Sequence, residues 1–133
     1  MSDFIATVAN IESCDGLNIV SFDYMGQMLS MMSLNINNNI QIGMRVKLIA
    51  KPSHIAIAKE FSGDISYSNK LPATITSVKN GQLLSSIKLN FLDTTLESII
   101  TLNSSQKMHL KVGDRVTAFI KASELSISEI VDD

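Results

Sequence analysis

The sequence is poor in the residues that carry most enzyme chemistry. Its 133 residues include one cysteine, two histidines, two prolines and no tryptophan. A single cysteine, Cys14, excludes an intramolecular disulfide and favours a reducing compartment. The histidines, His54 and His109, form no ligand-spaced cluster with Cys14 or with a carboxylate motif. We therefore expect no enzyme activity, no catalytic residues, no metal-ligating residues and no cofactor.

Several binding classes are disfavoured in the same way. No stretch approaches the roughly 18 to 20 uninterrupted apolar residues of a membrane helix, and the opening MSDFIATVANIESCDG lacks the pattern of a secretory signal. The six glycines are scattered and form no phosphate-binding GxxxxGK loop. A net charge of −2 and only seven aromatic residues argue against a nucleic-acid partner. A cytoplasmic protein without membrane or nucleic-acid partners is predicted.

What the sequence does contain is an internal repeat. Three matches occur in the same order, separated by 67, 68 and 70 positions: ATVANI (6–11) with ATITSV (73–78), SMMSLN (30–35) with SIITLN (98–103), and IGMRVKLIAKPS (42–53) with VGDRVTAFIKAS (112–123). This pattern indicates a tandem duplication. Gly, Asp and Ser cluster between the copies in EFSGDISYSN (60–69), so two domains are expected, 1–62 and 66–133.

Each half is predicted to be mainly β. Ile87, Leu89 and Phe91 alternate with Lys88 and Asn90, which is the period of a half-buried strand. Turn residues separate such runs, in KNGQ (79–82) and LDTT (92–95). With 45% hydrophobic residues the chain folds. Two tandem five-stranded barrels of the oligonucleotide/oligosaccharide-binding (OB) type are expected, and because barrels of this size are marginal alone we expect an oligomer.

One short helix is predicted, in NSSQKMHL (103–110), where Asn103, Ser104 or Ser105 is a suitable N-terminal cap. The counterpart in the first half, NINNNIQI (35–42), is shorter and rich in asparagine. There we expect a loop instead.

Methionine is the compositional oddity. MGQMLSMM brings Met25, Met28, Met31 and Met32 close together in sequence, and thioethers bind Cu(I). The repeat favours packing instead, because Met31 and Met32 align with Ile99 and Ile100, and Met28 aligns with Leu96.

Both copies of the third repeat segment end in lysine, one residue, then serine. On a strand with Ile120 facing inward, Lys121 and Ser123 share the outward side. A cation with hydroxyls, including those of Thr101 and the serines after it, suits a small anion, whose charge must be met by donors when it leaves water. The alternative is a solvated strand end.

The second copy resembles a known family. LKVGDRVTAFIKAS (110–123), preceded by IITLNSS (99–105), is similar to the Mop domain of the molbindins, within the wider TOBE family. The family's opening Ser-Ala-Arg-Asn-Gln-Leu resembles the start of SYSNKLPATI (66–75): Ser66, Asn69 and Leu71 match, and Ser68 stands where the arginine would be. The resemblance covers essentially the whole chain as two tandem domains.

This resemblance implies storage of molybdate or tungstate, bound in pockets between neighbouring domains of a six-domain ring. A two-domain chain would form a homotrimer. The matching positions are, in the second domain, Lys121, Ser123, Thr101 and Ser66, with Asn69 and Lys70 as helpers, and in the first domain Lys51, Ser33 and Ser53.

The departures from the family favour a rival hypothesis. Ser68 removes a planar charged donor, and Pro52 in place of Ala122 removes a backbone N–H. The first domain also lacks the opening segment, so it is expected to be degenerate. The rival is a duplicated-barrel interaction or regulatory module of a molybdate or tungstate transport system, with weak or no anion binding.

Overall fold

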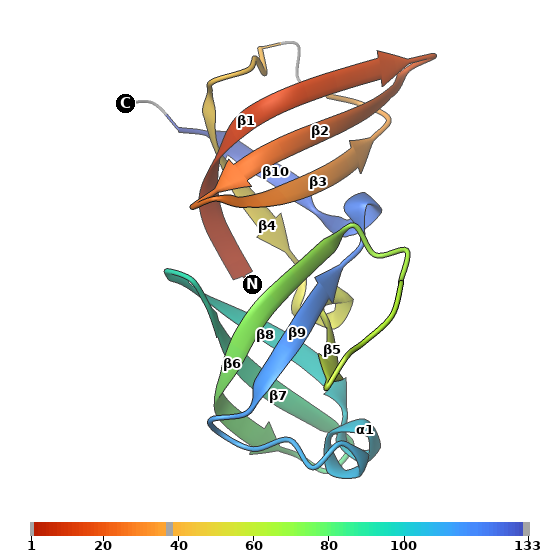
Figure 1. Cartoon of the computed structure of the whole chain (residues 1–133), viewed down its shortest axis with the longest axis vertical. Helices are drawn as coiled ribbons and strands as arrows, with labels where there is room; N and C mark the ends of the chain where they lie inside the picture. Colours follow the sequence, from red (N-terminus) through yellow and green to blue (C-terminus); the bar gives the residue numbers. More distant parts are fainter. Residues whose placement is uncertain (1, 37–38, 132–133) are drawn as a thin grey trace.

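The computed structural model describes residues 2–36 and 39–131 and consists of two antiparallel five-stranded sheets stacked end to end (Figure 1). The first sheet has the order β10-β4-β1-β2-β3 and the second the order β5-β9-β6-β7-β8. The elements are β1 (Ser2–Cys14), β2 (Leu17–Tyr24), β3 (Gln27–Ser33), β4 (Arg45–Ala50), η1 (Pro52–His54), β5 (Ala56–Lys59), β6 (Asn69–Asn80), β7 (Leu84–Phe91), β8 (Thr94–Thr101), α1 (Leu102–Lys107), β9 (Arg115–Ile120), η2 (Ala122–Glu124) and β10 (Ser126–Ile130).

The predicted fold class is confirmed: the chain is mainly β, with two curled five-stranded sheets. The predicted helix is present as α1, but its cap is Thr101, whose Oγ1 accepts the Ser104 N–H at 3.1 Å. In the 35–42 segment no helix occurs among the described residues, and positions 37 and 38 lie outside them. No helix in the described ranges is long and apolar enough to span a membrane.

Alternating burial places the apolar core on one face of each curled sheet. Val20, Phe22 and Tyr24 of β2 are buried at the positions that Ile87, Leu89 and Phe91 occupy in β7. The repeat also extends to irregularities, because β1 and β6 carry their β-bulges at equivalent places, between Val8 and Asn10 and between Ile75 and Ser77.

The last strand of each half belongs to the other sheet. β4 of the first sheet continues through η1 into β5, which pairs with β9 of the second sheet. β9 continues through η2 into β10, which pairs with β4 of the first sheet. Figure 1 shows these two connectors in the middle of the molecule. The sheets are therefore built across the expected boundary between 1–62 and 66–133, which stays a prediction about the sequence repeat.

Strand pairing corrects the repeat alignment in β3. Val20 pairs with Met31, and its equivalent Ile87 pairs with Ser98, so Met31 takes the place of Ser98. The sequence alignment is therefore wrong by one residue in this strand, where Ser33 takes the place of Ile100 and not of Thr101.

The methionines follow this shift. Packing is confirmed for Met31, which is buried, whereas Met28 and Met32 are exposed on the other face of β3. Because Met31 is buried on the opposite face of β3 from Met28 and Met32, these three thioethers do not gather on one side of the strand. The structure therefore does not favour the copper hypothesis.

Asn69 joins the two sheets. Its side chain is 1% exposed, and its Oδ1 accepts the Ser30 N–H at 2.7 Å while its Nδ2 donates to the Ser30 carbonyl at 2.9 Å. The second Nδ2 hydrogen reaches the Ile120 carbonyl at 3.0 Å. The amide thus pairs with the edge of β3 as a peptide group would, and it fixes the residue that precedes Lys121.

Replacing Asn69 should destabilise the junction. Asn69→Ala leaves the buried Ile120 carbonyl without its present partner, which costs about 1–3 kcal/mol, and leaves the part-buried Ser30 N–H and carbonyl without theirs at a smaller cost. We expect the free energy of unfolding to fall by about 2–4 kcal/mol in urea titration. The neighbouring exposed Lys70→Ala is the control, and an equal loss in the two variants would contradict the junction role.

A second contact fastens α1 to the second sheet. Lys59 Nζ lies 3.2 Å from Asp114 Oδ2 and donates to the carbonyls of Met108 and His109, each at 3.1 Å. Asp114 Oδ2 also accepts the Lys111 N–H at 2.9 Å. These hydrogen bonds, first that of Lys111 and then that of Lys59, lower the pKa of the Asp114 carboxyl below its usual value.

This shift predicts an acid-sensitive contribution to stability. The folded-state pKa of Asp114 is depressed, so its stabilisation is complete above the unfolded value of about 3.9 and is lost as pH falls through the folded value. Asp114→Asn should lower the melting temperature at pH 6. It should make little difference at a pH low enough to protonate the Asp114 carboxyl in both the folded and the unfolded protein. Asp64→Asn, in the exposed linker, is the control. If Asp114→Asn lowers the melting temperature by the same amount in acid as at pH 6, the stabilisation does not come from the ionised Asp114 carboxylate.

Candidate functional site

The two Lys-x-Ser endings lie on the connectors that cross between the sheets. Lys51 precedes η1 with φ −71° and ψ 140°, and Lys121 precedes η2 with φ −64° and ψ 146°. The carbonyl of each lysine accepts a backbone N–H three residues later at 2.9 Å, from His54 and from Glu124. The two motifs are therefore copies in conformation as well as in sequence.

Each lysine lies with the serine of the other motif. One hollow of about 260 Å³ is lined by Lys121 and Ser53, together with Tyr67, Ile99 and Ile100 among others. A second, of about 220 Å³, is lined by Lys51 and Ser123, with Ile49 and Ser126 nearby. We call them the Lys121 hollow and the Lys51 hollow. The strand exchange produces this reciprocal arrangement, because it runs the two connectors past each other.

One contact between a histidine and a glutamate lies at the boundary of the two hollows. His54 Nδ1 lies 3.8 Å from Glu124 Oε2, and both residues line both hollows. They are also repeat equivalents, each three positions after its lysine. The rings of Tyr24 and Phe91, another equivalent pair, likewise meet at 5.6 Å. Contacts between equivalent residues are expected on a two-fold axis, so the two halves are related by an approximate two-fold axis through this site.

The Lys121 hollow contains a positioned cation. Lys121 Nζ lies 5.8 Å from the centroid of the Tyr67 ring, within the range of a cation–π contact. Tyr67 in turn packs on Phe119, with centroids 5.5 Å apart. Lys51 and Lys121 are both exposed, so their ammonium groups are accessible to a solute. A lysine and a hydroxyl at the edge of a small hollow can supply charge-assisted hydrogen bonds to an anion.

The structure brings together four of the predicted residues, Lys51, Ser53, Lys121 and Ser123, and places the others elsewhere. Thr101 lines a separate hollow with Gln82 and Gln106, and its hydroxyl caps α1 and donates to Ser104 Oγ at 2.9 Å. Both Asn69 amide hydrogens bond backbone carbonyls. Ser66 and Lys70 are exposed and are not among the residues that line either hollow.

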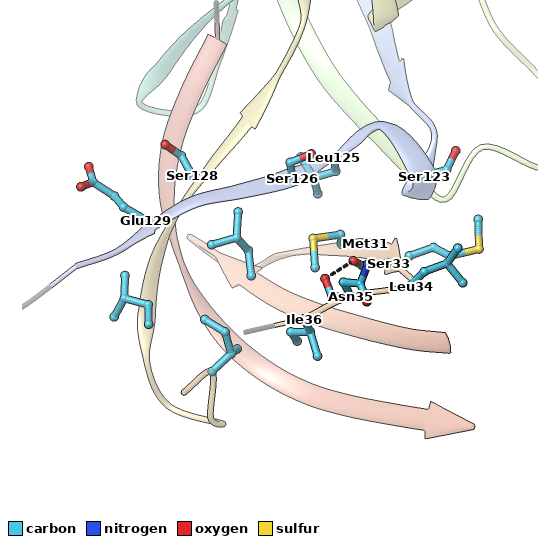
Figure 2. Close-up of a pocket in the computed structure, with 14 residues that line it drawn as sticks. Met31, Ser33, Leu34, Asn35, Ile36, Ser123, Leu125, Ser126, Ser128 and Glu129 are labelled. Atoms are coloured by element: carbon cyan, nitrogen blue, oxygen red, sulfur yellow. Dashed lines mark hydrogen bonds between the residues drawn. The ribbon is translucent and has the colours of Figure 1, made fainter. Parts of the chain in front are cut away.

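Ser33 borders a larger groove of about 540 Å³ between β3 and β10, drawn in Figure 2. Its hydroxyl donates to the Asn35 carbonyl at 2.7 Å, the dashed line in that figure. Ser123 lines this groove as well as the Lys51 hollow. The groove and the Lys51 hollow thus share Ser123, but Ser33 itself does not line the Lys51 hollow.

Sequence reasoning missed His54, Glu124 and Tyr67. The first two carried a readable signal, because KPSH (51–54) and KASE (121–124) place opposite charges at the same position of the repeat. That position becomes meaningful only when the two connectors are known to meet. Nothing in the sequence indicates that Tyr67 lies beside Lys121.

Comparison with known proteins agrees with this architecture. Residues 65–127 match the TOBE domain family. The molybdenum import ATP-binding proteins ModC of Brucella abortus strain 2308 and Brucella suis biovar 1 strain 1330 are each 32% identical over 80 residues, which are 59% of this chain and 22% of each relative. The chain therefore spans about a fifth of the length of these curated relatives.

A solved structure shares the two-sheet arrangement. The cytoplasmic molybdate-binding protein ModG, crystallised with molybdate bound, superposes with a TM-score of 0.89 at 22% identity, over 94% of this chain and 93% of ModG. The chain therefore has the ModG fold. A molybdate-binding protein from Sporomusa ovata is 37% identical over 45% of this chain and 90% of its own, with a TM-score of 0.44.

Proposed function

We propose that this protein binds molybdate or tungstate in the Lys121 and Lys51 hollows. The observation that carries the proposal is the reciprocal pairing of each lysine with the serine of the other repeat. The TOBE match over residues 65–127 supports it. So does the fold shared with ModG, which was crystallised with molybdate.

The chemistry of the hollows suits a tetrahedral dianion. The lysine supplies charge, and the serine hydroxyl supplies a directional donor. The carboxylate of Glu124 at both hollows opposes the anion, so one chain alone gives an incomplete site. Donors from a neighbouring chain would complete it, and their spacing would favour the larger oxyanions over sulfate.

The biological role that follows is storage or buffering of the oxyanion in the cytoplasm, without catalysis. The assembly is a homotrimer of two-domain chains. Exposed apolar side chains support association, since Leu34 is 73% and Leu83 81% exposed. We expect light scattering to give three times the chain mass of 14.5 kDa; a monomer at micromolar concentration would contradict the trimer.

The lysines provide the direct test of binding. We expect calorimetry to show saturable binding of molybdate and tungstate but not sulfate. Lys121→Ala and Lys51→Ala should each weaken binding at least tenfold in the hollow that the replaced lysine lines, because each removes a charge-assisted contact worth about 1.5–3 kcal/mol. Lys79→Ala, on an exposed strand end that lines neither hollow, is the matched control.

Either of two results would contradict the proposed oxyanion binding. One is the absence of binding heat and of thermal stabilisation with any of the anions, in a folded oligomer. The other is binding that Lys121→Ala and Lys51→Ala leave unchanged. The first result would favour an interaction or regulatory module, consistent with Ser68 at the family's arginine position.

A further inference from the structure

The His54–Glu124 pair is the only acid–base contact in the described residues that faces both anion hollows. Its side chains are 38% and 32% exposed, so the pair is partly screened by water and open to solutes. Exact repeats would place two like residues here. This chain has a base in one copy and an acid in the other.

We propose that binding of an anion in either hollow causes His54 to take up a proton. The His54–Glu124 pair then couples anion binding in one hollow to anion binding in the other and to pH. The inference rests on the proposed oxyanion binding and adds its regulation. It follows from geometry, because the pair lies at the boundary of the two hollows and each hollow contains a single lysine.

The groups that face His54 come from each surrounding segment. Glu124 of η2 favours the imidazolium, whereas Lys51 after β4 and Lys121 after β9 oppose it. The Tyr67 phenol of the linker also lines the Lys121 hollow, and β8 contributes only Ile99 and Ile100. A dianion bound in either hollow adds negative charge on the side of the ring where the lysines lie, and so favours the charged form of His54.

The direction of the coupling follows from linkage. A bound anion raises the pKa of His54, so affinity is highest below the pKa of the free protein and declines as pH rises through the pKa of the complex. A shift of one pKa unit corresponds to a tenfold change in affinity between these limits. Once His54 carries a proton, its positive charge also faces the second hollow and offsets part of the repulsion between the two bound anions.

NMR titration of the full chain tests the proton directly. The only histidines are His54 and His109, and His109 lies after α1 and lines neither hollow. Between about pH 5.5 and 8.5, around the usual histidine value, saturating molybdate should raise the His54 pKa and leave that of His109 unchanged. Equal behaviour of the two histidines would overturn the proposal.

Binding measurements with variants separate this proposal from the proposed function. Molybdate affinity of the unchanged protein should fall up to tenfold from about pH 6.5 to 8.5. His54→Gln should make it independent of pH, and His109→Gln should not. Glu124→Gln should strengthen binding at every pH. If molybdate binds with no pH dependence, the coupling is wrong while the anion site stands; if nothing binds at any pH, the proposed function itself fails.

Discussion

The crossing of the two connectors is the constraint on which this structure depends. β4–η1–β5 and β9–η2–β10 each carry the chain from one sheet into the other, so each sheet needs the other half for its fifth strand. Because the connectors run past each other, their equivalent residues meet. The pairing of each lysine with the serine of the other repeat, and of His54 with Glu124, follows directly.

The junction around the connectors is rigid for identifiable reasons. Asn69 joins the edge of β3 to the residue that precedes Lys121. The Tyr24 and Phe91 rings pack across the approximate axis, and Thr94 Oγ1 donates to the Asp3 carbonyl at 3.0 Å. These contacts fix the relative position of the two sheets. A site assembled from both repeats can therefore be preorganised although each half supplies only part of it.

Much of the fold could be predicted from the sequence, because strands, turns and the duplication are local patterns. The alternation in β7 and the position of α1 illustrate this. The exchange of β5 and β10 could not be predicted, since periodicity shows that a segment is a strand but not which sheet it joins. Lys121, Ser123, Lys51 and Ser53 were predicted from their motif, whereas the placement of each lysine beside the serine of the other repeat depends on a long-range crossing. The role of buried Asn69 in joining the two sheets could not be predicted either, because its hydrogen-bond partners lie far from it in the sequence.

The most direct test of oxyanion binding in the two hollows is anomalous diffraction at the molybdenum edge from crystals grown with molybdate. We expect molybdenum in both hollows, with oxygens within hydrogen-bond distance of Lys121 and Ser53 in one and of Lys51 and Ser123 in the other. Molybdenum beside Thr101 or Ser66 and remote from both lysine–serine pairs would contradict it.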